Sequence, residues 1–377
     1  MHICIDARIS RGSWFTGVGK YTISLVDQLA RLAPDNTYTI LVHPAAGPIP
    51  VREPERFRIA PLRASVGSIK QHLWIPRWVK SQRIDVVLHT HPVSAMLAQP
   101  CASVTVILDV YPLRFPEYYG LAARLAYKFL VPRAVRRNDR CIAISQCTKQ
   151  DAVSFLSVAA EKVDVVHLAA SEIFRPIPKG PSLNEVLRTY GVDRPYVLYH
   201  GNKRPHKNIV GLLRGFWQLK RQSALPHKLV VTGQENPREH EFDFSALRQV
   251  IGELGIESEV HFTGLVLEED LPYLYSGADL LAMPSYYEGF GLPALEAMAC
   301  GTPVVASNAG AIPEIVGDAA VLVSPHDINQ LAHAIQDVLS NLDLRRQLSE
   351  IGIRRAKCFS WKQTARKTLD ILAEVVM

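Results

Sequence analysis

The chain has 377 residues, of which 48% are hydrophobic and 21% charged, and this composition excludes a mini-protein, a collagen-like chain and a disordered chain. The length is about twice that of a common single domain, so two domains are expected. The formal net charge is +6, and the whole positive excess lies in residues 1–175. A nucleic acid, an anionic membrane and a phosphorylated substrate are all compatible with this excess.

Short β-branched, apolar runs alternate with segments of helical period along the whole chain. This alternation predicts parallel sheets with helices on both faces, hence an α/β protein of two Rossmann-like, doubly wound domains. The predicted strands are 3–6, 37–43, 86–90, 104–108, 140–144, 163–167, 196–200, 228–232, 260–263, 280–283, 304–307 and 320–323. The predicted helices include 18–32, 121–137, 209–222, 295–300, 328–342 and 361–376.

A proline-rich stretch at 174–195 predicts a linker between the two domains. The domains are then expected at about 1–175 and 190–358, and the last helix, about 360–377, can return to either. Ligands of such sheets bind at the carboxyl ends of the strands, which predicts a cleft between the domains.

The six cysteines include no Cys-x-x-Cys pair and no His/Cys cluster of metal-ligand spacing, which indicates free thiols in a reducing compartment. The first residues enter a strand without the pattern of a signal peptide, and no apolar run is long enough for a membrane helix. We therefore expect a cytoplasmic protein, with peripheral association with the inner face of a membrane as an open alternative.

The most informative segment is 284–307, which follows an apolar strand and carries Gly289 and Gly291 before a predicted helix with Pro293 in its first turn. A strand, a glycine loop and a helix N-terminus together predict an anion site. We expect Glu296 in the first helical turn, where it suits the hydroxyls of a ribose, and Glu288 in the loop, from which it can reach the cleft.

This segment resembles the signature of the retaining glycosyltransferases of family 4, which have the GT-B fold. Glu288 and Glu296 enclose seven residues that include Gly-Phe-Gly-Leu-Pro, and Ala-Cys-Gly-Thr-Pro-Val-Val-Ala follows. The resemblance extends to further segments along nearly the whole chain, namely 6–8, 16–21, 108–119, 199–208, 260–266, 270–279 and 359–361. It implies that the last helix crosses back to the first domain and that the chain is similar to bacterial mannosyltransferases of glycan assembly.

The resemblance also implies the roles of individual residues. Glu288 contacts the transferred sugar, Glu296 holds the nucleotide ribose, and Lys207 binds the donor diphosphate. The catalytic residues are then Glu288, Lys207 and Asp109. The donor-binding residues are Gly17, Gly19, Asn202, Arg204, Lys207, Glu288, Gly289, Phe290, Gly291, Leu292 and Glu296.

Two positions depart from the family pattern. Asn202 stands where an arginine is usual, so either Lys203 or Arg204 supplies the charge or the diphosphate has one cation fewer; the planar fork of Arg204 favours it. Leu108 stands where a histidine is frequent, and leucine neither donates a hydrogen bond nor titrates. Asp109, His89 or His91 can replace that histidine, the site can work without it, or activity is impaired.

The family resemblance implies a front-face displacement in which the leaving phosphate helps to deprotonate the acceptor hydroxyl. The chain contains no Asp-x-Asp sequence for a divalent ion on the diphosphate, so we expect no metal and no cofactor. The expected reaction moves a hexose from a nucleotide-diphosphate sugar to a glycan. Similar sequences often use GDP-mannose, which makes mannose the first choice.

Two functions other than an active glycosyltransferase are also considered. A nucleotide-sugar-binding protein of impaired activity is compatible with Leu108 and Asn202. A Rossmann dehydrogenase is disfavoured, because Thr22 occupies the place of the third glycine after Gly17 and Gly19.

The first half of the chain carries the features of an acceptor site. Residues 70–83 combine cations with Trp74 and Trp78, and residues 122–137 form an apolar helix with five basic side chains. This composition suits an anionic membrane surface and a polyprenyl-diphosphate-linked acceptor. An ordinary amphipathic helix with its tryptophans in the core is the alternative, since Pro76 interrupts a long interfacial helix. No nucleic-acid-binding module is recognised, which disfavours a nucleic acid.

Overall fold

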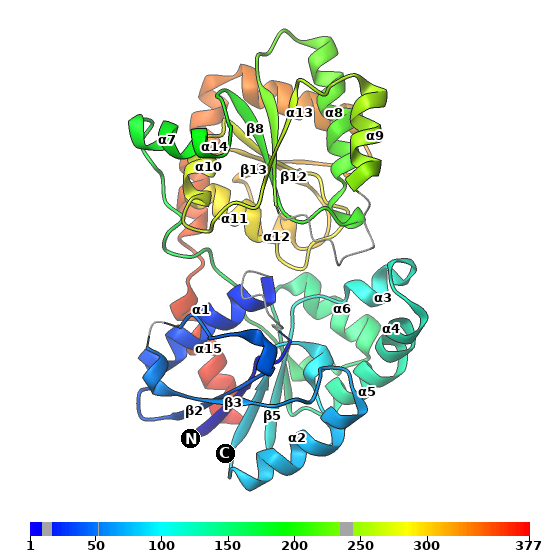
Figure 1. Cartoon of the computed structure of the whole chain (residues 1–377), viewed down its shortest axis with the longest axis vertical. Helices are drawn as coiled ribbons and strands as arrows, with labels where there is room; N and C mark the ends of the chain where they lie inside the picture. Colours follow the sequence, from blue (N-terminus) through cyan, green and yellow to red (C-terminus); the bar gives the residue numbers. More distant parts are fainter. Residues whose placement is uncertain (10–16, 52, 234–243) are drawn as a thin grey trace. The chain divides into compact units, whose positions relative to one another are not determined.

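The computed structural model describes residues 1–9, 17–51, 53–233 and 244–377. They form two compact units, the first of Met1–Leu168 with Ser360–Met377 and the second of Ala169–Phe359. Each unit is one parallel sheet with helices packed on it (Figure 1). The predicted fold class is therefore confirmed.

The first unit is built on a seven-stranded parallel sheet of order β3-β2-β1-β4-β5-β6-β7. Its strands are β1 (His2–Asp6), β2 (Thr37–Val42), β3 (Phe57–Pro61), β4 (Val86–His89), β5 (Ala102–Ile107), β6 (Arg140–Ala143) and β7 (Val163–Val165). Most residues of the central strands are apolar and buried because helices cover both faces of the sheet. The edge strand β3 was not predicted, since only two of its five residues are buried and it contains Arg58 and Pro61.

The second unit is built on a six-stranded parallel sheet of order β10-β9-β8-β11-β12-β13. Its strands are β8 (Tyr196–His200), β9 (Lys228–Thr232), β10 (Val260–Gly264), β11 (Leu280–Met283), β12 (Val304–Ser307) and β13 (Ala320–Val323). All six lie where the sequence predicts strands. The order reverses between β8 and β11, and in such sheets this switch point is where ligands bind.

Helices follow most of the strands in both units. Those of the first unit are α1 (Gly17–Leu32), α2 (Ile69–Ser81), α3 (Tyr111–Arg114), α4 (Leu121–Leu125), α5 (Val131–Arg136), α6 (Gln146–Leu156) and α15 (Trp361–Glu374). Those of the second unit are α7 (Pro181–Thr189), α8 (Ile209–Gln222), α9 (Phe244–Leu254), α10 (Leu271–Gly277), α11 (Leu292–Ala299), α12 (Ile312–Val316), α13 (Ile328–Ser340) and α14 (Leu342–Ala356). A π-helical turn, Ala126–Leu130, joins α4 to α5.

The last helix, α15, belongs to the first unit, as the family resemblance implies. The ring of Trp361 packs against Tyr21 of α1 with centroids 6.0 Å apart. The hydroxyl of Thr364 donates to the carbonyl of His167 at 2.6 Å. These contacts anchor the helix beside α1 (Figure 1).

The expected linker at 174–195 is wrong in part, because it contains α7. Pro181 opens this helix, and Leu183 and Leu187 are buried against α10. A proline at the first helical position is compatible with a helix start, and the proline count alone concealed it. The boundary between the units falls after Leu168, a few residues before the predicted 175.

Pro76 does not interrupt α2, which runs through it from Ile69 to Ser81. The two tryptophans of this helix have different environments. Trp78 packs against the core of the first unit, whereas Trp74 is 53% exposed. The core alternative therefore holds for Trp78, while the membrane-surface interpretation stays a prediction for the exposed Trp74.

Candidate functional site

The loop between β11 and α11 holds Glu288 in a buried position. Glu288 is only 8% exposed, which is unusual for a residue with a charged side chain. Its main chain is fixed by Ala311, whose N–H donates to the carbonyl of Glu288 at 2.9 Å. Gly310, at φ +60°, lies so close that a Cβ there would be 2.6 Å from the same carbonyl oxygen. Glycine is therefore required at this position if Glu288 is to keep its place.

The Glu288 carboxylate forms an ion pair with Lys207. The ammonium Nζ lies 2.7 Å from Oε1 and 2.6 Å from Oε2, and the hydroxyl of Ser285 donates to Oε1 at 2.8 Å. A buried charge is tolerated only when it is paired and hydrogen-bonded, and both conditions are met here. The structure thus brings together two of the three predicted catalytic residues.

Lys207 ends a short 3-10 turn, Pro205–Lys207, that follows β8, and Asn208 ties this turn to the rest of the unit. Asn208 has a left-handed backbone at φ 55° and caps α8 by accepting from the N–H of Gly211. Its amide nitrogen donates to the carbonyls of Pro284 at 3.0 Å and Pro325 at 2.8 Å. The N–H of Tyr286 donates to the carbonyl of His206 at 2.7 Å. The two loops that carry Lys207 and Glu288 are therefore held together by side-chain and main-chain bonds.

Two neutral side chains, His206 and Tyr199, lie near the ion pair. Burial, with the charges of Lys207 and Arg204, lowers the pKa of His206 to about 2. Burial, with the charge of Glu288, raises the pKa of the Tyr199 phenol above its ordinary value. Both side chains are uncharged at neutral pH, so the further charge near the ion pair comes from Arg204 and not from these two rings.

The basic loop after β8 indicates which side chain can supply the charge of the arginine that is usual at position 202. The ammonium of Lys203 is buried and donates to the carbonyl of Gly233 at 2.9 Å. The side chain of Asn202 is exposed, and its amide oxygen accepts from the N–H of Arg204 at 3.4 Å. Because Lys203 serves a main-chain carbonyl, Arg204 is the better candidate for a second cation on a diphosphate.

Glu296 lies in the second turn of α11, and the expectation of the first turn is wrong. The helix begins after Gly291, which has φ 103° and is the N-cap, so Glu296 is its fifth residue. Its carboxylate is buried and accepts a hydrogen bond from the phenol of Tyr275 at 2.8 Å. Burial and the neighbouring Glu296 raise the pKa of Tyr275, which keeps the phenol protonated as a donor.

The other predicted donor-binding residues divide between the two units. Gly289, Phe290, Gly291 and Leu292 belong to the loop and first turn that follow Glu288, and the ring of Phe290 packs edge-on against Phe359 at 6.0 Å. Gly17 and Gly19 belong to the first unit and lie within the first turn of α1 rather than in a loop. Thr16, which begins that motif, is outside the described residues.

Asp109 lies in the first unit, directly after the last residues of β5. Its Oδ1 accepts the N–H of Tyr111 at 3.0 Å, which shapes the turn into α3. His91, after β4, is influenced by Asp109: burial lowers the pKa of the imidazole, and the Asp109 charge partly opposes this. A catalytic role for Asp109 stays a prediction.

His89 is not available to replace the histidine that is absent at position 108. Its ring is fully buried, with Nδ1 3.4 Å from Asp6 Oδ2. Asp6 also forms a bidentate pair with the buried Arg8. Burial alone would raise the pKa of Asp6, but Arg8 and His89 hold it well below its usual range. His89 therefore serves the interior of the fold, and His91 is the remaining histidine of the two.

Sequence reasoning missed several supporting residues. These residues hold Glu288, Lys207 or Glu296 in place, and they are Ser285, Asn208, Gly310 and Tyr275. Each of them either is distant along the chain from the residue that it holds or contacts it through a turn. Asn208 before an apolar helical period is a recognisable cap signal. No signal in the sequence pairs Tyr275 with Glu296.

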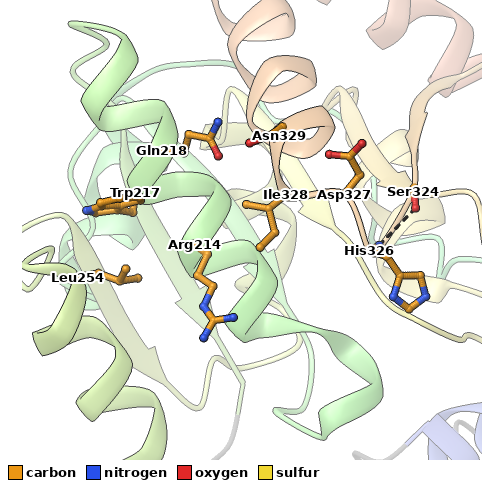
Figure 2. A pocket seen from close by; sticks show the side chains of 9 residues that line it. All are labelled: Arg214, Trp217, Gln218, Leu254, Ser324, His326, Asp327, Ile328 and Asn329. Carbon is orange, nitrogen blue, oxygen red and sulfur yellow. Dashed lines mark hydrogen bonds between the residues drawn. The ribbon is translucent and has the colours of Figure 1, made fainter.

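A separate hollow of about 680 Å³ lies on the second unit, away from the residues predicted for the site. Side chains of α8 line one side, and the segment Ser324–Asp327 with the start of α13 lines the other (Figure 2). The ring of His326 stacks on Tyr286 at 4.9 Å, which connects this segment to the loop of Glu288. Its lining residues are Arg214, Trp217, Gln218, Leu254, Ser324, His326, Asp327, Ile328 and Asn329.

Comparison with known families decides the classification. The model of the glycosyl transferases group 1 matches residues 189–355, and the model of glycosyltransferase family 4 matches residues 15–170. The O-antigen chain mannosyltransferase B of Escherichia coli is 30% identical over 270 residues, which are 71% of this chain and 69% of that protein. The chain belongs to glycosyltransferase family 4.

Two further similar proteins extend this comparison. The MMP alpha-(1->4)-mannosyltransferase of Mycolicibacterium hassiacum is 32% identical over 65% of this chain and 56% of that protein. The structure of Anabaena HepE in complex with UDP-glucose has a TM-score of 0.79 and 19% identity over 99% of this chain and 100% of that one. The chain is thus a glycosyltransferase of the GT-B fold, and within its described part no helix has the length and apolar character to cross a bilayer.

Proposed function

We propose that this family 4 glycosyltransferase moves mannose from GDP-mannose to a hydroxyl of a glycan or polyprenyl-diphosphate-linked acceptor, with retention of configuration and without a metal. The reaction would take place in the cytoplasm, at the inner face of a membrane. The observation that carries the proposal is the buried Lys207–Glu288 pair beside the loop of α11, with Glu296 held by Tyr275. The mannosyltransferase relatives support the choice of sugar.

In the proposed reaction, the bond between the anomeric carbon and the donor phosphate oxygen breaks, and the acceptor oxygen forms the new bond on the same face. The acceptor proton moves to the leaving phosphate, so a nucleoside diphosphate and a glycoside result. Positive groups near the phosphate stabilise the charge that develops there. Lys207 and Arg204 would supply this charge from the loop after β8.

The geometry suits this division of tasks. An ammonium group has three N–H donors, and two of them are directed to the oxygens of Glu288. The third can reach a phosphate oxygen while Lys207 still holds Glu288. Glu288 is thereby oriented to accept hydrogen bonds from sugar hydroxyls. Glu296, one helical turn into α11, would accept hydrogen bonds from the hydroxyls of the ribose. Asp109 and the glycines of α1 would act from the acceptor side.

The surface of the first unit supports a membrane-linked acceptor. Leu121, Leu125 and Phe129 follow each other at intervals of four residues, and all three are exposed, Leu121 by 71%. Arg124 and Lys128 are exposed on the same helical segment. Lys128 lies 5.5 Å from the centre of the Phe129 ring. Exposed apolar side chains flanked by cations are typical of a face that binds an anionic lipid surface.

The first prediction concerns transfer itself. Among nucleotide sugars supplied with isotopic label, GDP-mannose should give the highest transfer, and the anomeric configuration of the product should match that of the donor. Glu288→Ala should lower turnover at least about 100-fold, as expected for loss of a group that acts in the transition state. Calorimetry should show that nucleoside diphosphate affinity is largely kept, since Glu288 touches the sugar.

Glu350→Ala, which alters an exposed carboxylate of α14, is the matched control and should leave transfer unchanged. Equal loss of nucleotide affinity in Glu288→Ala would remove the assignment of Glu288 to the sugar. Nucleotide binding without sugar release from any donor would favour the binding-protein alternative.

A second prediction concerns the support of Glu296. Tyr275→Phe removes the hydrogen bond to Glu296 and should weaken nucleoside diphosphate binding about tenfold, the equivalent of one hydrogen bond. The effect should vanish for a 2′,3′-dideoxyribose nucleotide, because Glu296 then has no hydroxyl to bind. Tyr196→Phe is the matched control, since the buried phenol of Tyr196 donates to the carbonyl of Leu274 at 2.6 Å and not to Glu296. An equal effect in both variants, or on both nucleotides, would contradict the role of Glu296.

A third prediction concerns the membrane. Vesicles that contain anionic lipid should bind the protein, and the binding should weaken as salt rises, because the attraction is partly electrostatic. The double change Leu125→Ser with Phe129→Ser should reduce binding at least about tenfold, since each buried apolar side chain contributes about 1.5–3 kcal/mol. Leu267→Ser, at an exposed leucine of the second unit, is the control. Binding that is indifferent to anionic lipid would remove this part of the proposal.

A further inference from the structure

A second hollow, of about 300 Å³, lies in the first unit between two groups of helical segments. One wall comes from α4, the π-helical turn and α5, and includes Ala123, Ala126 and Leu130. The other wall includes His72 of α2 and Val93 of the 3-10 turn Pro92–Ser94. Its volume is at the lower end of the range for small-molecule sites, which is about 300–1,000 Å³.

The lining of this hollow is almost wholly apolar. Most of its residues are Ala, Val, Leu, Pro or Gly, and the other two are His72 and Tyr127. One wall contains a π-helical turn, a rare feature that is frequent at functional sites. The small side chains Ala123 and Ala126 leave the space open.

His72 provides one polar group at the hollow. Its Nδ1 accepts the N–H of Leu97 at 3.3 Å, and burial, with the charge of Arg8, lowers the pKa of the ring. The neutral ring then carries its proton on Nε2. Within the described residues, this buried Nε2 has no hydrogen-bond partner. An oxygen of a ligand is the acceptor that would satisfy it.

The two helical segments that border the hollow also carry the exposed apolar and basic side chains. Leu73 and Trp74 follow His72 on α2 and are both about half exposed, and Lys70 lies 5.3 Å from the Trp74 ring. The helical segments of the other wall carry two exposed pairs of a cation and an apolar side chain, Arg124 with Leu125 and Lys128 with Phe129. The same segments thus contribute both the apolar lining of the hollow and exposed cations.

We propose that this hollow binds the isoprenoid chain of a polyprenyl-diphosphate-linked acceptor next to its phosphate. The inference rests on the proposed function, because it names the part of the acceptor that the first unit recognises. This occupant is favoured by the combination of an apolar hollow, an imidazole N–H donor and exposed cations on the helical segments that form its walls, which matches an isoprenoid joined to a phosphate.

The test uses farnesyl diphosphate as a short probe and calorimetry of the full chain. All titrations contain a saturating nucleoside diphosphate, the best binder among GDP, UDP and ADP, so that the probe cannot occupy the donor diphosphate site. The wild-type protein should bind farnesyl diphosphate more tightly than either farnesol or inorganic pyrophosphate. Ala126→Phe, which fills the hollow, should weaken this binding at least tenfold.

Three further variants sharpen the result. Ala123→Leu fills the hollow from α4 and should act like Ala126→Phe, which guards against a fold defect at the π-helical turn. Ala160→Phe adds the same bulk at an exposed site of the same unit and should have no effect. His72→Phe should weaken binding of farnesyl diphosphate but not of farnesol.

Wild-type protein that does not bind the probe, or filled variants that bind it equally well, would overturn the inference. Self-association that Ala126→Phe abolishes would assign the hollow to a second copy and would also overturn it. These outcomes differ from failure of the proposed function, which would appear as absence of sugar transfer to any acceptor, including one without a lipid.

Discussion

The site depends on one interaction, the buried ion pair of Lys207 and Glu288. The two residues are 81 positions apart, and the pair joins the loops that follow β8 and β11 at the switch point of the second sheet. Removing one partner of a buried pair leaves an uncompensated charge and commonly costs about 3–5 kcal/mol. The left-handed Asn208 and the close approach of Gly310 keep the loops at the required distance. In the function that we propose, this arrangement would fix the sugar-binding carboxylate of Glu288 before the donor arrives.

The sequence predicted the fold well where one local signal was strong. Parallel strands buried on both faces are continuous apolar runs, so all six strands of the second sheet were found. The edge strand β3 and the helix α7 were missed, because a half-exposed strand with Arg58 and Pro61 and a helix that opens at Pro181 both resemble loops. Glu288 and Glu296 were identified by their motif, but their partners were not. The ion pair with Lys207 and the bond from Tyr275 depend on tertiary packing, which a local pattern does not encode.

The uneven charge of the chain acquires a physical meaning in this fold. The second unit carries the paired charges of Lys207 and Glu288, with Arg204 on the same loop as Lys207, which suits a small ligand with a charged diphosphate. The first unit places its cations next to exposed leucines and a phenylalanine, and between these segments lies an apolar hollow. We infer that the second unit recognises the donor by hydrogen bonds and paired charge. The first unit recognises the acceptor by apolar contact and cations.

The central claim is that Lys207 holds Glu288 and also recognises the donor diphosphate. The most direct measurement compares the affinities of a nucleoside diphosphate and the monophosphate of the same base, by calorimetry, in the wild-type protein and in Lys207→Met. Lys357→Met, at an exposed lysine of the same unit, is the control. The account predicts that Lys207→Met lowers the preference for the diphosphate over the monophosphate at least about tenfold, because the variant loses a hydrogen bond to a charged group. A preference that is unchanged in Lys207→Met would contradict the account.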